Sequence, residues 1–200
     1  MSNLNIRITN DNGHTYQIKA KQYEKLETLI THARDTMTSP CIYHLLSWVS
    51  DAEAFKVNKR DLIKLFKRKL RKQYKRLQQQ APNTLIAYSI EFKYTDNDER
   101  EGASNHPVTS VQLPFLHIHF YVIADCNTCN RITFPKFAID ALDEIEGLSK
   151  GRYFKSNTGE LYKKVKEDFD DSFQRLLYIA KINQKSEHIP FRETFGASSV

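Results

Sequence analysis

Two long segments rich in β-branched and aromatic residues constrain the fold of this chain most strongly. Residues 84–94 (TLIAYSIEFKY) and 113–125 (LPFLHIHFYVIAD) have the composition of central β-strands. The segment between them, residues 95–112, is polar and contains Gly and Pro, which is typical of a long loop. The simplest arrangement makes the two segments neighbouring antiparallel strands of one sheet.

Turn and helix signals surround these strands. A β-hairpin is predicted at residues 5–19, where apolar and polar residues alternate on both sides of an Asn-Asp-Asn-Gly turn. Elsewhere, apolar residues recur at helical spacing. The predicted helices span residues 21–37, 41–48, 58–77, 135–148 and 161–185, and a short strand is predicted at 151–156. These elements predict an α+β fold in which helices flank a central antiparallel sheet.

The predicted helix at residues 58–77 is the most basic part of the chain. We expect Asn58 to cap it. Residues 56–76 hold eleven Lys or Arg and one Asp, whereas the rest of the chain holds 19 basic and 23 acidic residues. Such a local positive stripe indicates a polyanion-binding surface, with nucleic acid ahead of membrane, or else a solvated helix face. Its core-facing stripe is predicted to consist of Leu62, Phe66, Leu70, Tyr74 and Leu77. The candidate DNA contacts are Lys64, Lys67, Arg68, Arg71, Lys72, Lys75 and, on the last predicted helix, Lys185.

The segment QQQAPN, residues 78–83, interrupts the helical pattern and is the best candidate for an internal boundary. It divides the chain into an N-terminal part, residues 1–82, and a core, residues 83–186. Residues 187–200 are predicted to form a loose C-terminal tail.

Composition excludes several classes of protein. With 200 residues, 40% of them hydrophobic, the chain has the composition of a globular protein with a sizeable core. No apolar run approaches the ~20 residues that span a bilayer, and the N-terminus lacks a signal-peptide pattern. Three Cys are too few for a disulfide framework, so we expect a protein of the reducing cytoplasm. Cys126-x-x-Cys129 with Cys41-x-x-His44 offers four zinc ligands, an alternative metal site.

The sequence His117-Ile118-His119 lies inside the second strand. Because side chains alternate between the faces of a strand, both imidazoles lie on one face and can converge on one divalent metal. Glu91, a carboxylate in the otherwise apolar first strand, reaches the same face if the strands pair, and completes a His-His-carboxylate set. His106 is a rival third ligand. In the alternative interpretation, Glu91 faces solvent and the histidines are ordinary sheet residues.

Tyr178 and Lys181 are three residues apart on the last predicted helix and therefore share one of its faces. A metal or ammonium group near a phenol stabilises its anion, so Tyr178 is the candidate nucleophile and Lys181 its helper. The same spacing recurs at Tyr16 and Lys19 on the predicted hairpin, far from the helix that this chemistry requires. Tyr162 is a reserve nucleophile.

These motifs resemble the HUH endonuclease superfamily, whose members cut single-stranded DNA through a covalent phosphotyrosine. The resemblance covers residues 84–185 and rests on a His-hydrophobic-His strand, His117 and His119, followed 59 residues later by a helical Tyr-x-x-Lys, Tyr178 and Lys181. Within this superfamily, a motif with one catalytic tyrosine and the sequence RLLYIAK are most similar to the replication initiators of filamentous bacteriophages and related prophages. The resemblance implies an RRM-like palm, a Mn²⁺ or Mg²⁺ ion in the His-His-carboxylate set, and nicking by the tyrosine.

The resemblance also implies a biological role, the initiation of rolling-circle replication of a phage, prophage or plasmid in the cytoplasm of a bacterial host. The implied partners are single-stranded DNA at a replication origin, a host helicase and a DNA polymerase. The chain has neither GxxxxGK nor GxGxxG, so any ATP-driven unwinding needs a separate protein. The alternatives are a transposase or mobilisation relaxase with the same chemistry, and a non-catalytic module that stacks bases on Tyr88, Phe92 and Phe120.

Overall fold

The computed structural model describes residues 4–9, 13, 15–95, 113–155, 159–181 and 194–200. Its centre is a six-stranded antiparallel sheet of order β6-β3-β5-β4-β8, with the short strand β7 paired to β3. A separate hairpin joins β1 to β2. This confirms the predicted α+β fold, hairpin and central antiparallel sheet. The elements are β1 (Asn5–Thr9), β2 (Thr15–Lys19), α1 (Ala20–Thr36), β3 (Pro40–Val49), α2 (Ala52–Asn58), α3 (Leu62–Arg76), β4 (Thr84–Thr95), β5 (Leu113–Asp125), α5 (Phe134–Asp143), β6 (Leu148–Tyr153), β7 (Lys163–Lys164), α6 (Phe169–Leu177) and β8 (Phe195–Ala197).

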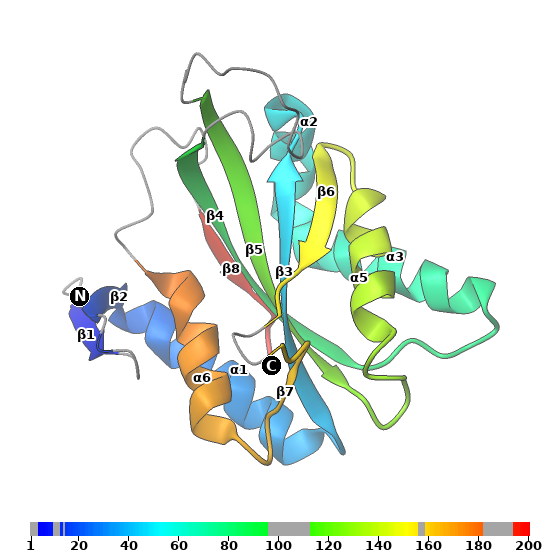
Figure 1. The fold of residues 1–200 in the computed structure, drawn as a ribbon, viewed down its shortest axis with the longest axis horizontal. Helices are drawn as coiled ribbons and strands as arrows, with labels where there is room; N and C mark the ends of the chain where they lie inside the picture. Colours follow the sequence, from blue (N-terminus) through cyan, green and yellow to red (C-terminus); the bar gives the residue numbers. More distant parts are fainter. Residues whose placement is uncertain (1–3, 10–12, 14, 96–112, 156–158, 182–193) are drawn as a thin grey trace.

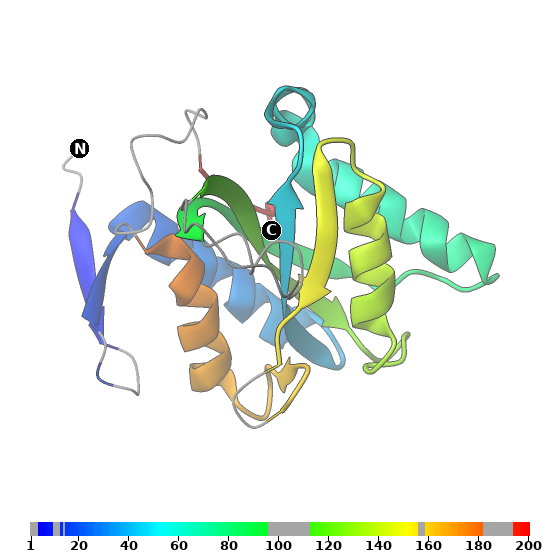
Figure 2. The ribbon, with the colours of Figure 1, turned by 45° about the horizontal axis from the view of Figure 1, so that its top comes forward.

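Helices cover both faces of the sheet (Figure 1, Figure 2). Helices α1 and α6 lie against one face, and α3 and α5 lie against the other. Alternation along β5 sends Ile118 and Phe120 into the core under α3 and α5, and Tyr121 into the core under α1 and α6. We call these two sides the α3 face and the α1 face. His117 and His119 alternate with Ile118 and Phe120 and therefore lie on the α1 face.

The two strands predicted at 84–94 and 113–125 are confirmed as β4 and β5. They pair antiparallel over their whole length, in a register that puts Glu91 opposite His117 and Ser89 opposite His119. Strand pairing of this kind fixes which side chains meet on each face. The position of the predicted ligands therefore follows from the register.

The prediction of a helix at residues 41–48 is wrong. This segment is β3, which lies between β5 and β6 in the sheet. Helices cover both of its faces, so its apolar residues do not alternate regularly with polar ones. A short continuous apolar run does not distinguish a buried strand from a helix. Since β3 precedes residue 82, the sheet combines strands from the 1–82 and 83–186 parts of the chain.

The start and end of the basic helix also differ from the prediction. Asn58 ends α2, and its side-chain Nδ2 donates to the carbonyls of Ala54 and Glu146 rather than capping α3. A 3-10 turn, Lys59–Asp61, separates the two helices. The first four residues of the predicted apolar stripe are buried, whereas Leu77 follows the helix and is 49% exposed.

The C-terminal region is less helical than predicted. Among the described residues 161–181, the helix predicted at 161–185 is confined to α6, because residues 163–164 pair with β3 and the Val165 N–H donates to the Pro40 carbonyl at 2.9 Å. The helix predicted at 135–148 ends at residue 143, and the predicted short strand is β6, at 148–153. The predicted loose tail contains β8, which pairs with β4 at the edge of the sheet.

Candidate metal centre

Glu91, His117 and His119 converge on the α1 face of the sheet. Glu91 Oε2 lies 3.6 Å from His117 Nε2 and 3.3 Å from His119 Nε2. The two Nε2 atoms lie 3.0 Å apart. The structure thus brings together the three side chains that the sequence predicts as one cluster, and they form a candidate metal site.

The spacing and chemistry of these three groups fit a divalent metal ion. Ligand bonds of about 2.1 Å at tetrahedral or octahedral angles place neighbouring donor atoms about 3.0–3.4 Å apart. The donor atoms here lie 3.0–3.6 Å apart. Two imidazoles and one carboxylate fill only part of a coordination shell, which leaves positions for water and a substrate oxygen. This mixed nitrogen and oxygen set suits Mn²⁺ and other first-row divalent ions at least as well as Mg²⁺.

Glu91 is a buried carboxylate, only 2% exposed, so the interpretation in which it faces solvent is wrong. Burial raises the pKa of Glu91, but hydrogen bonds from His117 and His119 outweigh burial and hold the pKa below its ordinary value of 4.5. The Ser89 hydroxyl donates to Oε1 at 3.1 Å, while Oε2 faces the two imidazoles. The carboxylate is therefore ionised and oriented before any metal binds.

His44, on β3, extends the cluster by one imidazole. Its Nε2 lies 2.8 Å from His119 Nδ1, and its ring stacks on Tyr121 with centroids 4.5 Å apart. Burial and then His119 hold the pKa of His44 well below its ordinary value. In the tautomer that binds a metal, His119 would donate its Nδ1–H to the neutral His44, and the Nε2 lone pair of His119 would face the ion in place of the Nε2–H that faces Glu91 in the metal-free protein.

This contact does not follow from a helix at residues 41–48, the structure that the sequence predicts there. A strand in that position pairs with the His117 strand, and the register puts Leu46 opposite His119 and His44 opposite Tyr121. Had residues 41–48 been assigned as a third central strand, this register would have placed His44 beside the metal candidates.

Tyr178 lies beside the same imidazoles. It begins the 3-10 turn Tyr178–Ala180 that follows α6, and its ring lies 6.4 Å from the ring of His119 at an interplanar angle of 71°. Lys181 Nζ lies 3.2 Å from the centroid of the Tyr178 ring, so the ammonium covers one face of the phenol. Tyr178 and Lys181 therefore adjoin the candidate metal site, although they follow α6 instead of lying within a long helix.

Of the other two tyrosines considered from sequence, Tyr16 lies near the site and Tyr162 does not. The ring of Tyr16, buried in β2, lies 5.2 Å from Lys181 Nζ, and burial and then Tyr178 raise its pKa. Tyr162 instead packs against Tyr43 on the α3 face, with centroids 5.7 Å apart. Tyr162 is therefore not a reserve nucleophile, and the hairpin is not far from the site.

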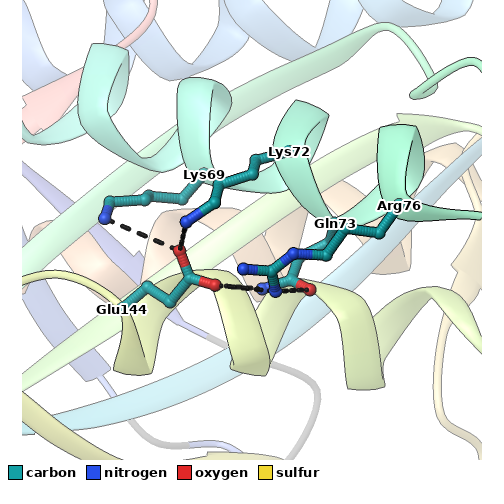
Figure 3. Close-up of polar contacts among 5 residues, drawn as sticks. All are labelled: Lys69, Lys72, Gln73, Arg76 and Glu144. Carbon is teal, nitrogen blue, oxygen red and sulfur yellow. Dashed lines mark hydrogen bonds and ion pairs between the residues drawn. The ribbon is translucent and has the colours of Figure 1, made fainter.

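The basic helix α3 lies on the opposite face of the sheet from this cluster (Figure 1). Glu144, which follows α5, accepts from Gln73 at 2.8 Å and pairs with three cations of α3 at 3.0–3.6 Å, as Figure 3 shows. These cations are Lys69, Lys72 and Arg76. Lys64 pairs with Asp61 at 3.1 Å. Four other candidate DNA contacts have no carboxylate partner among the described residues: Lys67, Arg68, Arg71 and Lys75.

DNA binding by α3 stays a prediction, because nothing in the structure tests it. Lys185, the remaining candidate contact, and His106, the rival metal ligand, lie outside the described residues.

The alternative zinc site does not form as predicted. Cys126 and Cys129 have their sulfur atoms 3.8 Å apart, and Cys126 Sγ contacts the Tyr43 hydroxyl at 3.1 Å on the α3 face. Cys41 belongs to the same core. His44, three residues later in β3, points to the opposite face and contacts His119. The four residues therefore cannot share one ion.

No protein-family model matches the chain, and neither the curated proteins nor the solved structures give a match. Within the described part of the chain, no helix is long and apolar enough to span a membrane. The geometry of Glu91, His117 and His119, a candidate metal site, points to a metal-dependent activity.

Proposed function

We propose that this protein nicks single-stranded DNA in a metal-dependent reaction, with Tyr178 as the nucleophile. The observation that carries the proposal is the position of the Tyr178 ring against His119, a member of a His-His-carboxylate cluster. A tyrosine next to paired histidines on an antiparallel sheet is what the resemblance to HUH endonucleases implies.

In the proposed step, Tyr178 Oη attacks the phosphorus of a phosphodiester. A bond from Oη to phosphorus forms as the bond from phosphorus to O3′ breaks, so the 5′-phosphate stays on the protein. The phenol loses its proton to solvent, and O3′ gains a proton to leave as a hydroxyl. Glu91, His117 and His119 would hold the divalent ion, which when bound stabilises negative charge on the phosphate oxygens.

Lys181 supports the attacking phenol. Its ammonium lies over the Tyr178 ring, where it can also contact the oxygens of a phosphate that the phenol attacks. Tyr16 lies against the same ammonium. The hairpin thus helps to position Lys181, and through it the nucleophile.

The rolling-circle role, with origin DNA, a helicase and a polymerase in a bacterial cytoplasm, belongs to the same proposal. A transposase or relaxase would share the chemistry and differ in its DNA substrate. A non-catalytic module that stacks bases on Tyr88 and Phe120 is disfavoured, because both side chains are buried in the core under α3. The side chain of Phe92 lies outside the described residues.

The test is to incubate the protein with circular single-stranded DNA of its own replicon and Mn²⁺, and to resolve the products under denaturing conditions. The proposal predicts a covalent protein–DNA adduct and a free 3′-hydroxyl. Chelation of the metal should abolish both. Cleavage without an adduct would show that water, and not a tyrosine, is the nucleophile.

A further inference from the structure

Arg152, in strand β6, and Phe154, just after it, lie on the same face of the sheet as the candidate metal centre. In the sheet, Arg152 lies opposite Leu46, and Leu46 lies opposite His119 on the other side of β3. Neighbouring strands are ~4.8 Å apart, so the backbone of Arg152 lies about 10 Å from that of His119. The surface of β6 is therefore close enough to contact a substrate that is held at the metal site.

Phe154, the residue after β6, links this surface to the metal ligands. Its N–H donates to the His44 carbonyl at 2.9 Å, and its ring stacks on the His44 ring with centroids 4.5 Å apart. The same ring lies 6.3 Å from that of His119. Phe154 is nevertheless 37% exposed, so the stack of Tyr121, His44 and Phe154 reaches the surface of the protein.

Two exposed cations lie beside this ring. The guanidinium of Arg152 lies 5.4 Å from the centroid of the Phe154 ring. Both Arg152 and Lys155 are exposed, and neither has an ion-pair partner in the part of the chain that the structure describes. A cavity of about 150 Å³ opens beside Phe154, with His44, Lys155 and Arg175 in its wall. Arg175 also pairs with Asp171 at 3.1 Å, and both side chains are 31% exposed, so a phosphate can share its guanidinium.

We propose that Arg152, Phe154, Lys155 and Arg175 form a nucleotide subsite next to the cleaved phosphate. The inference rests on the proposed function. An exposed aromatic ring offers a stacking platform for any base, and the surrounding cations neutralise backbone phosphates. A surface of interleaved basic and aromatic residues fits single-stranded DNA better than it fits an acidic protein partner. Such a protein would offer no planar base to stack on the Phe154 ring.

The subsite also differs in kind from the basic helix. Three cations of α3 share Glu144, and α3 packs on the face of the sheet opposite to that of His119. The cations around Phe154 lie on the face of the metal candidates. DNA that enters the active site should therefore depend on β6 at short range, whatever α3 contributes to binding.

The test uses an oligothymidylate of about ten nucleotides, with binding measured by fluorescence anisotropy in chelator so that no cleavage occurs. Phe154→Leu should weaken binding at least fivefold, because stacking contributes about 1–3 kcal/mol per base. Arg152→Ser should lower the slope of log affinity against log salt by about one unit. Tyr153→Leu is the matched control: Tyr153 is 42% exposed and alternates to the other face of β6, so its loss should change affinity less than twofold.

Two further measurements distinguish a failure of the subsite from a failure of the proposed nicking function. Mn²⁺ affinity and thermal stability of Phe154→Leu should match the wild type, which excludes an indirect effect through His44. Adduct formation by the wild type is measured in parallel. An adduct together with unchanged DNA affinity in Phe154→Leu and Arg152→Ser would overturn the subsite and leave the proposed function intact. Binding of the oligonucleotide without any adduct would overturn the proposed nicking and leave the subsite standing.

Discussion

His44 Nε2 lies 2.8 Å from His119 Nδ1, so the group that orients a candidate metal ligand comes from a different strand than the ligand itself. His44→Phe keeps a ring in the stack with Tyr121 and Phe154 but removes the acceptor. We expect it to weaken Mn²⁺ binding about 10–100-fold, the usual effect of losing a hydrogen-bond partner of a ligand. Isothermal titration of the purified protein measures this directly.

Two variants control for that prediction. His44→Gln restores an acceptor and should recover part of the affinity. His32→Gln alters an imidazole in α1, outside the cluster, and should leave Mn²⁺ binding unchanged. Equal affinity in the wild type and His44→Phe would show that His44 only fills space.

Glu91→Gln should lower the free energy of unfolding by about 1.5–3 kcal/mol in metal-free protein, because it removes charge-assisted hydrogen bonds from His117 and His119. The folded pKa of Glu91 lies below its ordinary value of 4.5. The contribution of the carboxylate is therefore present above about pH 4.5 and is lost as the pH falls through the folded pKa. Denaturant titrations across this range should show the difference between the two proteins shrinking toward acid. Growth of the difference toward acid would mean that Glu91 is buried as a neutral acid.

The basic helix makes a separate prediction about DNA affinity. Neutralising its four cations that have no carboxylate partner in the described part of the chain should weaken binding of single strands regardless of sequence. The salt slope should fall by up to about one unit per phosphate contact removed. The four cations are Lys67, Arg68, Arg71 and Lys75.

The matched control neutralises Lys69 and Lys72, which pair with Glu144. Its effect on the slope should be smaller, because these charges are already compensated. An unchanged slope in the four-cation variant would identify α3 as a solvated face.

Gly196→Ala tests the edge strand β8. A Cβ at Gly196 would overlap the ring carbons and hydroxyl of Tyr88. We expect a loss of about 1–3 kcal/mol in stability, the usual cost of overpacking. Thermal denaturation measures it, and Tyr88→Leu in the same chain should restore part of the loss. Full stability of Gly196→Ala would argue against the packing of β8 beside β4.

The parts of the fold that sequence could predict are those with a clear local signal. Residues 84–94 and 113–125 have strand composition over their whole length, and the period of two then places His117 and His119 on one face. The segment 41–48 carries no such signal, because it is apolar on both sides. Its position in the sheet depends on pairing with distant strands.

The site was predictable to the same extent. Glu91 could be placed with the histidines because its strand was recognised and a charge in an apolar run needs a partner. His44 depended on the unrecognised strand, and Phe154 on a strand that the structure places three residues earlier than predicted. The approach of Tyr16 to Lys181 is a tertiary contact between the hairpin and the turn after α6, which no local pattern encodes.

Tyr178→Phe tests the proposed nucleophile most directly. The change removes one oxygen and keeps the ring beside His119 and Lys181, so Mn²⁺ affinity, single-stranded DNA affinity and thermal stability should stay near those of the wild type. With replicon DNA and Mn²⁺, the wild type should form a covalent adduct that peptide mass spectrometry assigns to Tyr178, and the variant should form neither adduct nor nick. Nicking by Tyr178→Phe at a rate near that of the wild type would contradict the assignment of Tyr178 as the nucleophile.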